Sequence, residues 1–157
     1  QIVGLRYFNV YGPGEAHKGA MASIAYHLNT QLLQHGRVKL FDGSDGYTAG
    51  EQQRDFVHVD DVVAMNLWFM QKPQYSGVYN VGTGRPRTFN DVAKVLIGWH
   101  KYGEIDYIPF PQKLMGSYQS FTMADLTQLR NIGCKHQYKT LEAGLNDYLA
   151  WLNADNC

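Results

Sequence analysis

The sequence lacks an excess of either charge and lacks any long apolar segment. Its 14 lysines and arginines equal its 14 aspartates and glutamates, so the formal net charge of the 157 residues is zero. A nucleic-acid-binding domain usually carries a basic excess or a basic stripe, and this sequence has neither. No apolar run approaches the roughly 20 residues that cross a bilayer. We therefore expect neither a nucleic acid nor a membrane as a partner.

Cysteine is scarce as well. The sequence has Cys134 and Cys157 only, and neither lies near a second cysteine or a histidine at the spacing of a zinc finger. His136 follows Cys134 closely, but this pair supplies too few ligands for a structural metal. We expect no metal site, and we expect two reduced thiols in a cytoplasmic protein.

An initiating methionine is absent too. The chain opens on Gln1 and passes at once into an apolar segment, residues 2–5. Such an abrupt start on a strand of the buried type is what a piece of a longer protein shows. We expect this chain to be a fragment.

Apolar residues follow two periodicities in alternation along the chain. Short apolar runs predict strands at residues 2–8, 38–41, 54–59, 78–81 and 104–110, the first of them buried on both faces. Apolar residues at helical spacing predict helices at 21–34, 60–69, 88–100, 122–131 and 140–153. Trp68, Phe69, Trp99 and Trp151 lie on these helical stripes and are expected in the core. Strands that alternate with helices predict an α/β protein with a largely parallel sheet.

The loop after the first predicted strand, residues 9–13, is the first place to look for a ligand. In such sheets, ligands bind outside the carboxyl ends of the strands. Asn9 offers both a hydrogen-bond donor and acceptors. Asn9 and Gly12 are also ordinary turn residues, so composition alone leaves both interpretations open.

Three motifs resemble signatures of the extended short-chain dehydrogenase/reductase family, and they occur in that family's order. They are Arg6-Tyr7-Phe8-Asn9-Val10-Tyr11-Gly12-Pro13, then Arg54-Asp55-Phe56-Val57-His58-Val59-Asp60-Asp61-Val62, then Tyr79-Asn80-Val81-Gly82-Thr83-Gly84. The resemblance implies the carboxyl-terminal part of a Rossmann-type parallel sheet, interleaved with a small α/β substrate-binding domain. Residues 1–20 and 54–84 would belong to the sheet side, and 21–53 and 85–135 to the substrate lobe.

Further segments resemble one branch of that family, the ADP-glyceromannoheptose 6-epimerases. They are residues 17–23, 27–31, 107–111, 118–122 and 124–126. This resemblance implies NADP-dependent epimerisation at C6 of ADP-D-glycero-D-manno-heptose by transient oxidation and re-reduction, in the synthesis of the lipopolysaccharide inner core. It also implies a homo-oligomer. Two alternatives stay open: another nucleotide-sugar epimerase or dehydratase of the family, and a non-catalytic fragment of the substrate lobe.

The same resemblance assigns roles to individual residues. Lys18 is the candidate catalytic residue, as a second acid/base group, although a solvated loop lysine or a grip on a cofactor phosphate would also suit it. Val10 and Lys18 match positions that contact NADP. The substrate contacts carry over onto Asn9, Ala20, His27, Phe41, Asp42, Gly43, Ser44, Arg54 and Tyr118. Among these, the planar guanidinium of Arg54 suits a diphosphate.

Two parts of such an enzyme are absent from this sequence: the glycine-rich dinucleotide loop and the Tyr-x-x-x-Lys pair. The family carries both ahead of the position of Gln1. We therefore expect a missing amino-terminal, cofactor-binding half, and we expect this chain alone neither to retain NADP nor to turn over substrate. Ala20 stands where the most similar members carry serine, and the 45–53 loop is longer than in some members.

Overall fold

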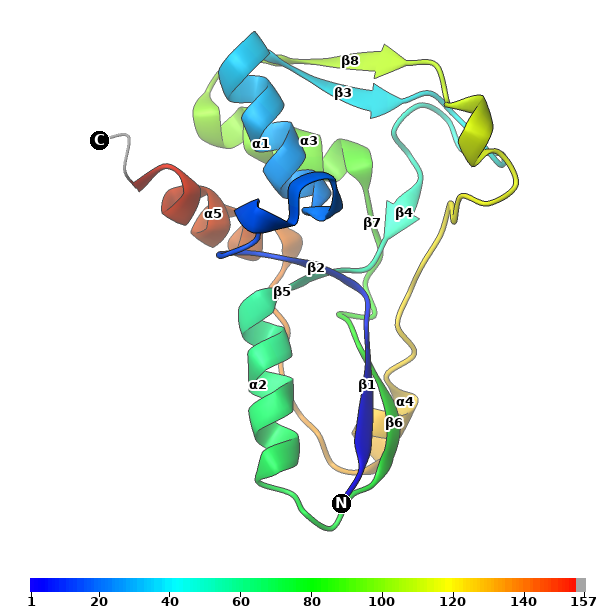
Figure 1. The fold of residues 1–157 in the computed structure, drawn as a ribbon, viewed down its shortest axis with the longest axis vertical. Coiled ribbons are helices and arrows are strands. Elements are labelled where there is room, and N and C mark those ends of the chain that lie inside the picture. The colour runs from blue at the N-terminus through cyan, green and yellow to red at the C-terminus, as the bar shows by residue number, and fades with distance from the viewer. Residues whose placement is uncertain (155–157) are drawn as a thin grey trace.

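The chain begins on a strand that changes its partner halfway along. β1 (Val3–Tyr7) pairs in parallel with β6 (Gly77–Val81), and after Phe8 the chain continues as β2 (Asn9–Tyr11), which pairs in parallel with β5 (Phe56–His58). In the computed structural model, which describes residues 1–154, this change of partner separates a lower lobe around β1 and β6 from an upper lobe beyond β2 (Figure 1). The prediction of a loop from residue 9 onward is therefore wrong for residues 9–11, because these residues form a strand that pairs with β5.

The lower lobe contains β1, β6 and two helices, α2 (Val59–Met70) and α4 (Thr127–Asn131). Its buried core consists of Val57, Val62, Met65, Phe69, Tyr79, Val81, Ala124, Leu126, Leu129 and Cys134. Residues 124–134, which the sequence assigns to the substrate lobe, thus pack on the sheet side. Helix α2 is capped by the His58 ring, whose Nδ1 accepts the Asp60 N–H at 3.2 Å. Asp60 and Asp61 occupy the first turn, at the positive end of the helix dipole.

The upper lobe contains three helices and a parallel strand pair: α1 (Ile24–His35), α3 (Phe89–His100), α5 (Leu141–Leu152), β3 (Arg37–Phe41) and β8 (Glu104–Ile108). Local sequence explains the helix ends. Ser23 caps α1 and Gly36, at φ 68°, ends it, while Thr88 and Asp91 form a reciprocal capping box at α3. The core of this lobe includes Leu28, Leu32, Val38, Leu40, Val92, Leu96, Leu145, Tyr148 and Leu149.

Short elements join the two lobes. β4 (Gln53–Arg54) pairs antiparallel with β7 (Arg87–Thr88), and two short 3₁₀ turns, η1 (Ala16–Met21) and η2 (Gln112–Leu114), lie in the connecting loops. The observed α/β fold with parallel strand pairs confirms the predicted fold class. The helix predicted at 122–131 is wrong before Thr127, because residues 120–122 run extended beside Gln53. The Gln53 amide donates to the Ser120 carbonyl at 2.9 Å, and the Thr122 amide donates to the Gln53 carbonyl at 3.2 Å.

Some predicted core positions lie at the surface. Phe69 is buried and Trp68 and Trp99 pack partly against the two cores, but Trp151 is 52% exposed. The expectation that the first strand is buried on both faces is also wrong, since Ile2 is 82% exposed. Within residues 1–154, β1 has a strand neighbour on one edge only, which leaves its other edge open.

The described residues contain one free thiol and no cluster of metal ligands. Cys134 is a buried free thiol whose sulfur lies 3.8 Å from that of Met65, and Cys157 lies outside the described residues. Across residues 1–154, no three His, Cys, Asp or Glu side chains gather as metal ligands. No helix in the same range is long and apolar enough to cross a membrane.

Candidate active site

Arg54 is a buried cation without a carboxylate partner. The residue is 7% exposed, and no Asp or Glu oxygen among residues 1–154 lies within 4.0 Å of its guanidinium. Its Nη1 donates to the Gln53 carbonyl at 3.0 Å. Burial lowers the pKa of Arg54 from its ordinary value, and the nearby Tyr118 hydroxyl opposes that change. Burying a charge is costly unless an opposite charge compensates it, so this position favours an anionic ligand.

Aromatic rings hold the Arg54 guanidinium in place. Its central carbon lies 4.9 Å from the centre of the Tyr118 ring and 5.8 Å from that of Phe89. Tyr118 itself belongs to a cluster with Phe41 and Phe110, in which ring centres are 5.2 to 6.5 Å apart. Cation–π contacts restrict the side chain without consuming its hydrogen-bond donors. Apart from the Nη1 hydrogen bond to the Gln53 carbonyl, the donors of Arg54 thus remain available to a ligand.

A cavity of about 350 Å³ lies beside this cluster, between α1, β3 and β8. Three residues that the resemblance assigned to the substrate line it together: His27, Phe41 and Tyr118. The remaining lining comes from Ile24, Gln31, Lys39, Leu40, Gly50, Gln52, Phe89 and Ile108. This combination of flat rings, aliphatic carbons and a few amide groups suits a planar base or a sugar ring.

The loop after β3 closes the carboxyl end of this strand pair. Gln52 holds the loop by donating to the Asp42 carbonyl at 3.0 Å and to the Ser44 hydroxyl at 3.1 Å. A Cβ on Gly43 would lie 2.2 Å from the Tyr47 carbonyl oxygen, so only glycine fits the close approach of the two backbone segments. The Asp42 amide donates to the Ile108 carbonyl at 2.8 Å and is therefore not free to grip a phosphate. The Ser44 hydroxyl keeps its own proton to donate.

The predicted residues nearer the amino terminus occupy other places. Asn9 is exposed and Val10 half-buried in β2, and the Asn9 side chain accepts a long hydrogen bond, 3.5 Å, from the Thr122 hydroxyl. Lys18 and Ala20 are exposed on η1. As far as residues 1–154 describe it, the lining of the 350 Å³ cavity includes none of these four residues. Within the described residues, Arg54 lies outside the lining as well, but it packs on two lining rings, Tyr118 and Phe89. The predicted site residues thus fall into a group at or near the cavity and an open group on β2 and η1.

Asp55 is a central residue of this region that the sequence reasoning missed. Its carboxylate is completely buried and accepts from the Thr83 amide at 2.7 Å, the Thr83 hydroxyl at 2.6 Å, and the Gly84 and Ala124 amides at 2.9 Å each. It thereby fixes the third motif and the 122–124 strip beside Arg54. An acid directly after an arginine in a strand that is otherwise apolar was the available signal.

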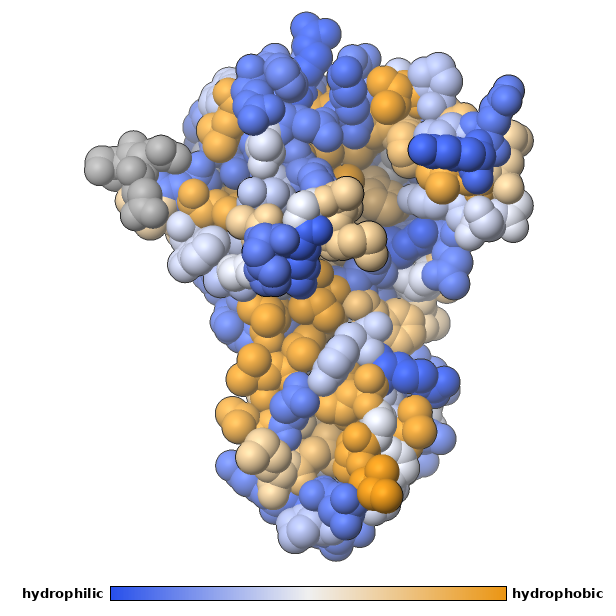
Figure 2. All heavy atoms as spheres, viewed as in Figure 1, coloured by the Kyte–Doolittle hydropathy of each residue, from blue (hydrophilic) through white to orange (hydrophobic). Residues whose placement is uncertain are grey.

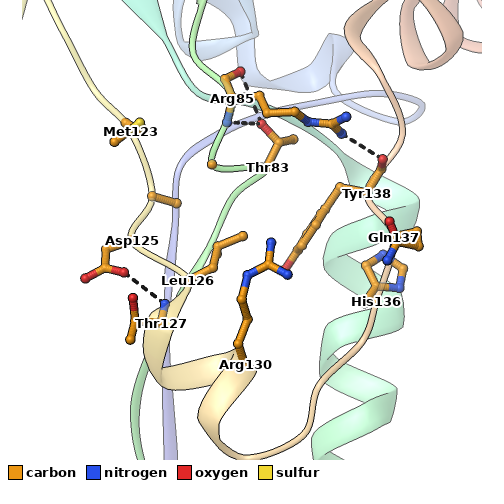
Figure 3. Close-up of a pocket in the computed structure, with 12 residues that line it drawn as sticks. Thr83, Arg85, Met123, Asp125, Leu126, Thr127, Arg130, His136, Gln137 and Tyr138 are labelled. Atoms are coloured by element: carbon orange, nitrogen blue, oxygen red, sulfur yellow. Dashed lines mark hydrogen bonds between the residues drawn. The ribbon is translucent and has the colours of Figure 1, made fainter.

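A second cavity, of about 430 Å³, lies in the lower lobe and contains none of the predicted site residues. Figure 3 shows it at the end of β6, between Arg85, Arg130 and Tyr138. Arg85 donates to the carbonyls of Tyr138 and Lys139 at 2.9 and 3.2 Å, and so ties the 136–139 segment to the strand end. The Arg85 side chain in this cavity wall therefore serves to hold the structure together.

The first part of the chain decides its family. Residues 1–82 match the model of the NAD dependent epimerase/dehydratase family, which is more than half of the 157 residues. The chain belongs to this family.

Individual members of the family resemble the chain over most of its length. The ADP-L-glycero-D-manno-heptose-6-epimerase of Alkalilimnicola ehrlichii is 57% identical over 149 residues, which cover 95% of this chain and 47% of that protein. The crystal structure of the Helicobacter pylori ADP-L-glycero-D-manno-heptose-6-epimerase is 36% identical with a TM-score of 0.80, covering 97% of this chain and 44% of the other. The Thermotoga maritima UDP-glucose 4-epimerase, solved with UDP-glucose, is 31% identical with a TM-score of 0.78, covering 99% and 47%. The chain thus spans about half the length of its relatives.

Proposed function

We propose that the chain is the carboxyl-terminal half of an NADP-dependent epimerase that inverts C6 of ADP-D-glycero-D-manno-heptose, giving ADP-L-glycero-D-manno-heptose. The main support is the buried guanidinium of Arg54, which has no carboxylate within 4.0 Å among residues 1–154 and lies beside an aromatic cavity. A cation next to an aromatic cavity suits a nucleoside diphosphate. The heptose assignment is supported by the 57% identity to a protein named for that activity. The product would serve the lipopolysaccharide inner core, and we place the reaction in the cytoplasm.

In this proposal each part of the site has one task. Arg54 binds the diphosphate through its fork, and the Tyr118 and Ser44 hydroxyls add neutral donors. Phe41 and the neighbouring aliphatic residues hold the base, and His27 lies at the same wall. Excluding water from this wall strengthens each charged contact. Binding energy from the nucleotide then orients the heptose towards β2 and η1.

Lys18 and Asn9 act at the reacting end of the substrate. Lys18 exchanges a proton with the oxygen on C6, and Asn9 binds a sugar hydroxyl at the end of β2. Inverting a carbinol requires proton exchange from two directions, so Lys18 works opposite a second acid/base group that lies outside this chain. When bound, NADP supplies the acceptor and donor of the hydride. The family resemblance assigns Val10 and Lys18 to the cofactor contacts, so these two residues would form one edge of a cofactor site.

The surface of the lower lobe supports a further, amino-terminal half. Figure 2 shows apolar residues gathered over α2 and β1, and the exposed members include Ile2, Val63, Leu67 and Met70. Contiguous exposed apolar surface marks an interface, and an unpaired parallel strand edge accepts another strand. Relatives about twice as long as this chain have the residues to cover both. We propose that this half also carries the cofactor loop, and that the complete enzyme forms a homo-oligomer.

The test is conversion of ADP-D-glycero-D-manno-heptose by the full-length, cofactor-loaded protein, followed by NMR at C6. We expect conversion, and we expect Lys18→Ala to lower kcat by about 10²- to 10⁴-fold, the usual contribution of a general acid/base. Lys94→Ala, an exposed lysine on α3, is the matched control and should leave kcat unchanged. If the folded protein leaves the heptose unchanged but converts UDP-glucose, the substrate proposal fails and only the family assignment remains.

A further inference from the structure

Glu15 is a buried carboxylate that the proposed reaction does not use. It is 3% exposed and belongs to neither the aromatic cavity nor the predicted substrate contacts. No Lys, Arg or His nitrogen among residues 1–154 lies within 4.0 Å of it. A buried carboxylate without a cation needs hydrogen-bond donors, and here those donors come from two separate segments. The Tyr148 hydroxyl of α5 lies close to the same carboxylate.

The Glu15 carboxylate ties the end of β2 to the start of α1. One oxygen, Oε1, accepts from the Ser23 hydroxyl at 2.7 Å and from the Gly12 amide at 3.4 Å. The other oxygen, Oε2, accepts from the Ser23 amide at 2.5 Å. Ser23 in turn caps α1, because its hydroxyl accepts from the Tyr26 amide at 3.3 Å. The carboxylate therefore joins the loop after Asn9 and Val10 to the helix that carries His27.

The segment between these anchors is the one that carries Lys18. The Lys18 amide donates to the Glu15 carbonyl at 3.0 Å, and the Ala22 amide donates to the Gly19 carbonyl at 3.0 Å. At its far end the segment is fixed by Ser23 on the Glu15 carboxylate. Glu15 thus closes residues 16–22 into a loop, with its backbone at one end and its side chain at the other. The side chains of 16–21 are exposed, so packing restrains them little.

We propose that Glu15 is a positioning residue of the reaction: its carboxylate holds the Lys18 loop in register with β2 and α1. This inference rests on the proposed role of Lys18. Glutamine has the same shape but offers one acceptor oxygen and one NH₂ group, which would face an N–H donor of Gly12 or Ser23. Glu15→Gln should therefore release one end of the loop while keeping the volume of the side chain.

The experiment is a double-mutant cycle in the full-length enzyme, with kcat and KM for ADP-heptose measured for Glu15→Gln, Lys18→Ala and the double variant. Misplacing a reacting group by about 1 Å can cost up to about 10²-fold, so we expect Glu15→Gln to lower kcat by roughly 10- to 100-fold. KM should change less, because Arg54 and the part of the cavity formed by β3, β8 and Tyr118 lie on other elements, although α1 also lines it. In the Lys18→Ala background the same change should lower kcat by less than about 2-fold, since both act through one ammonium.

A control and a second measurement separate positioning from folding. Asp61→Asn makes the same change at another buried carboxylate, which bonds His136 and the Lys139 amide, and should leave kcat of the folded enzyme unchanged. Hydrogen exchange should accelerate in Glu15→Gln at the amides of residues 18–23, and not in α3. An unchanged exchange pattern, or equal losses in both backgrounds of an active enzyme, would overturn the inference. An inactive wild type would refute the proposed function alone, and hydrogen exchange would then decide whether Glu15 holds the loop.

Discussion

In the upper lobe, α1, α3 and α5 enclose a core in which Leu28, Leu32 and Leu96 have no exposed surface, whereas in the lower lobe α2 turns apolar residues outward. Val63, Leu67 and Met70 lie on one face of α2 at spacings of four and three residues, and all three are exposed. The open edge of β1 lies in the same lobe. Both lobes therefore have a buried core, but the lower lobe also leaves an apolar helix face and a strand edge exposed.

Under the proposed function, this difference divides the site between a pocket that this chain forms and a reacting end that a further segment would complete. The pocket assigned to the nucleotide lies in the upper lobe, where rings and aliphatic groups are already held by a closed core. Asn9, Val10 and Lys18 lie at or near the boundary between the lobes, on short elements where Asn9 and Lys18 are exposed and Val10 is half-buried. In the proposed enzyme, the nucleotide pocket would thus be formed within this chain, and catalysis would also require the surface that the lower lobe leaves open.

The prediction with the largest expected effect compares the buried core of the upper lobe with the exposed apolar face of α2, in the full-length protein. Leu96→Ala removes a fully buried side chain and should lower the free energy of unfolding by about 3 kcal/mol. Leu67→Ala changes a side chain that is 51% exposed here, and should cost about 2 kcal/mol if the amino-terminal half covers α2. Urea unfolding, with midpoints and slopes compared, measures both.

The matched control for this comparison is Leu33→Ala, on the exposed face of α1 in the upper lobe. Surface substitutions usually stay within about 0.5 kcal/mol, and we expect that here. If Leu67→Ala costs no more than Leu33→Ala, α2 remains exposed in the complete protein. The exposed apolar face of α2 would then need an explanation other than a covering segment.

The next effect concerns Arg54, which ties the pocket to the substrate. Arg54→Lys keeps the charge but loses the fork and the planar stacking on Tyr118. A charge-assisted hydrogen bond contributes about 1.5–3 kcal/mol, so KM for the nucleotide sugar should rise roughly 10- to 100-fold. Arg37→Lys, whose arginine pairs with Glu104 on the surface at 3.1 Å, should leave KM unchanged. An unchanged KM in Arg54→Lys would show that Arg54 does not bind the diphosphate.

The sequence predicted the local elements better than their environment. Periodicity located α1, α3 and α5, because amphipathic helices of the closed upper lobe bury the face that their pattern marks. The periodicity wrongly predicted that β1 is buried on both faces, because an apolar strand has the same pattern whether one or both of its edges are paired. It also missed the extended 120–122 strip, whose conformation depends on Gln53, some 67 residues away, and not on local propensity.

For the site, motif resemblance supplied residues and the structure supplied their grouping. His27, Phe41 and Tyr118 are far apart in sequence and line one cavity. Nothing in the local pattern distinguishes Glu15 from a surface acid, and the apolar strand around Asp55 indicates burial but not its partners, because the donors to both carboxylates lie on other segments. Long-range hydrogen bonding of buried carboxylates is the part of a site that periodicity and composition cannot predict.

The smallest expected effect tests the junction between the lobes through pH. Burial, and then the charge of Lys139, lowers the pKa of His58 below its ordinary value, against the opposing effect of Asp60. The folded protein thus binds this proton less readily than the unfolded chain. The contribution to stability is therefore complete above the unfolded pKa of about 6.5 and is lost as pH falls below it, at up to about 1.4 kcal/mol per pH unit. Burial also lowers the pKa of His100, on α3, which titrates in the same window.

His58→Asn keeps an acceptor for the Asp60 amide and removes the titrating ring. Urea unfolding of the full-length protein at pH 7.5 and 5.5 should show a smaller loss of stability in His58→Asn than in the wild type. His100→Asn should reduce that loss less, because the ring of His58 is nearly inaccessible whereas that of His100 is only partly buried. Carboxylates such as Asp91, whose pKa is held below its ordinary value partly by the Arg87 guanidinium, titrate at lower pH and leave this window clear. Equal losses in the wild type and His58→Asn would mean that the junction between the lobes does not sense pH through this ring.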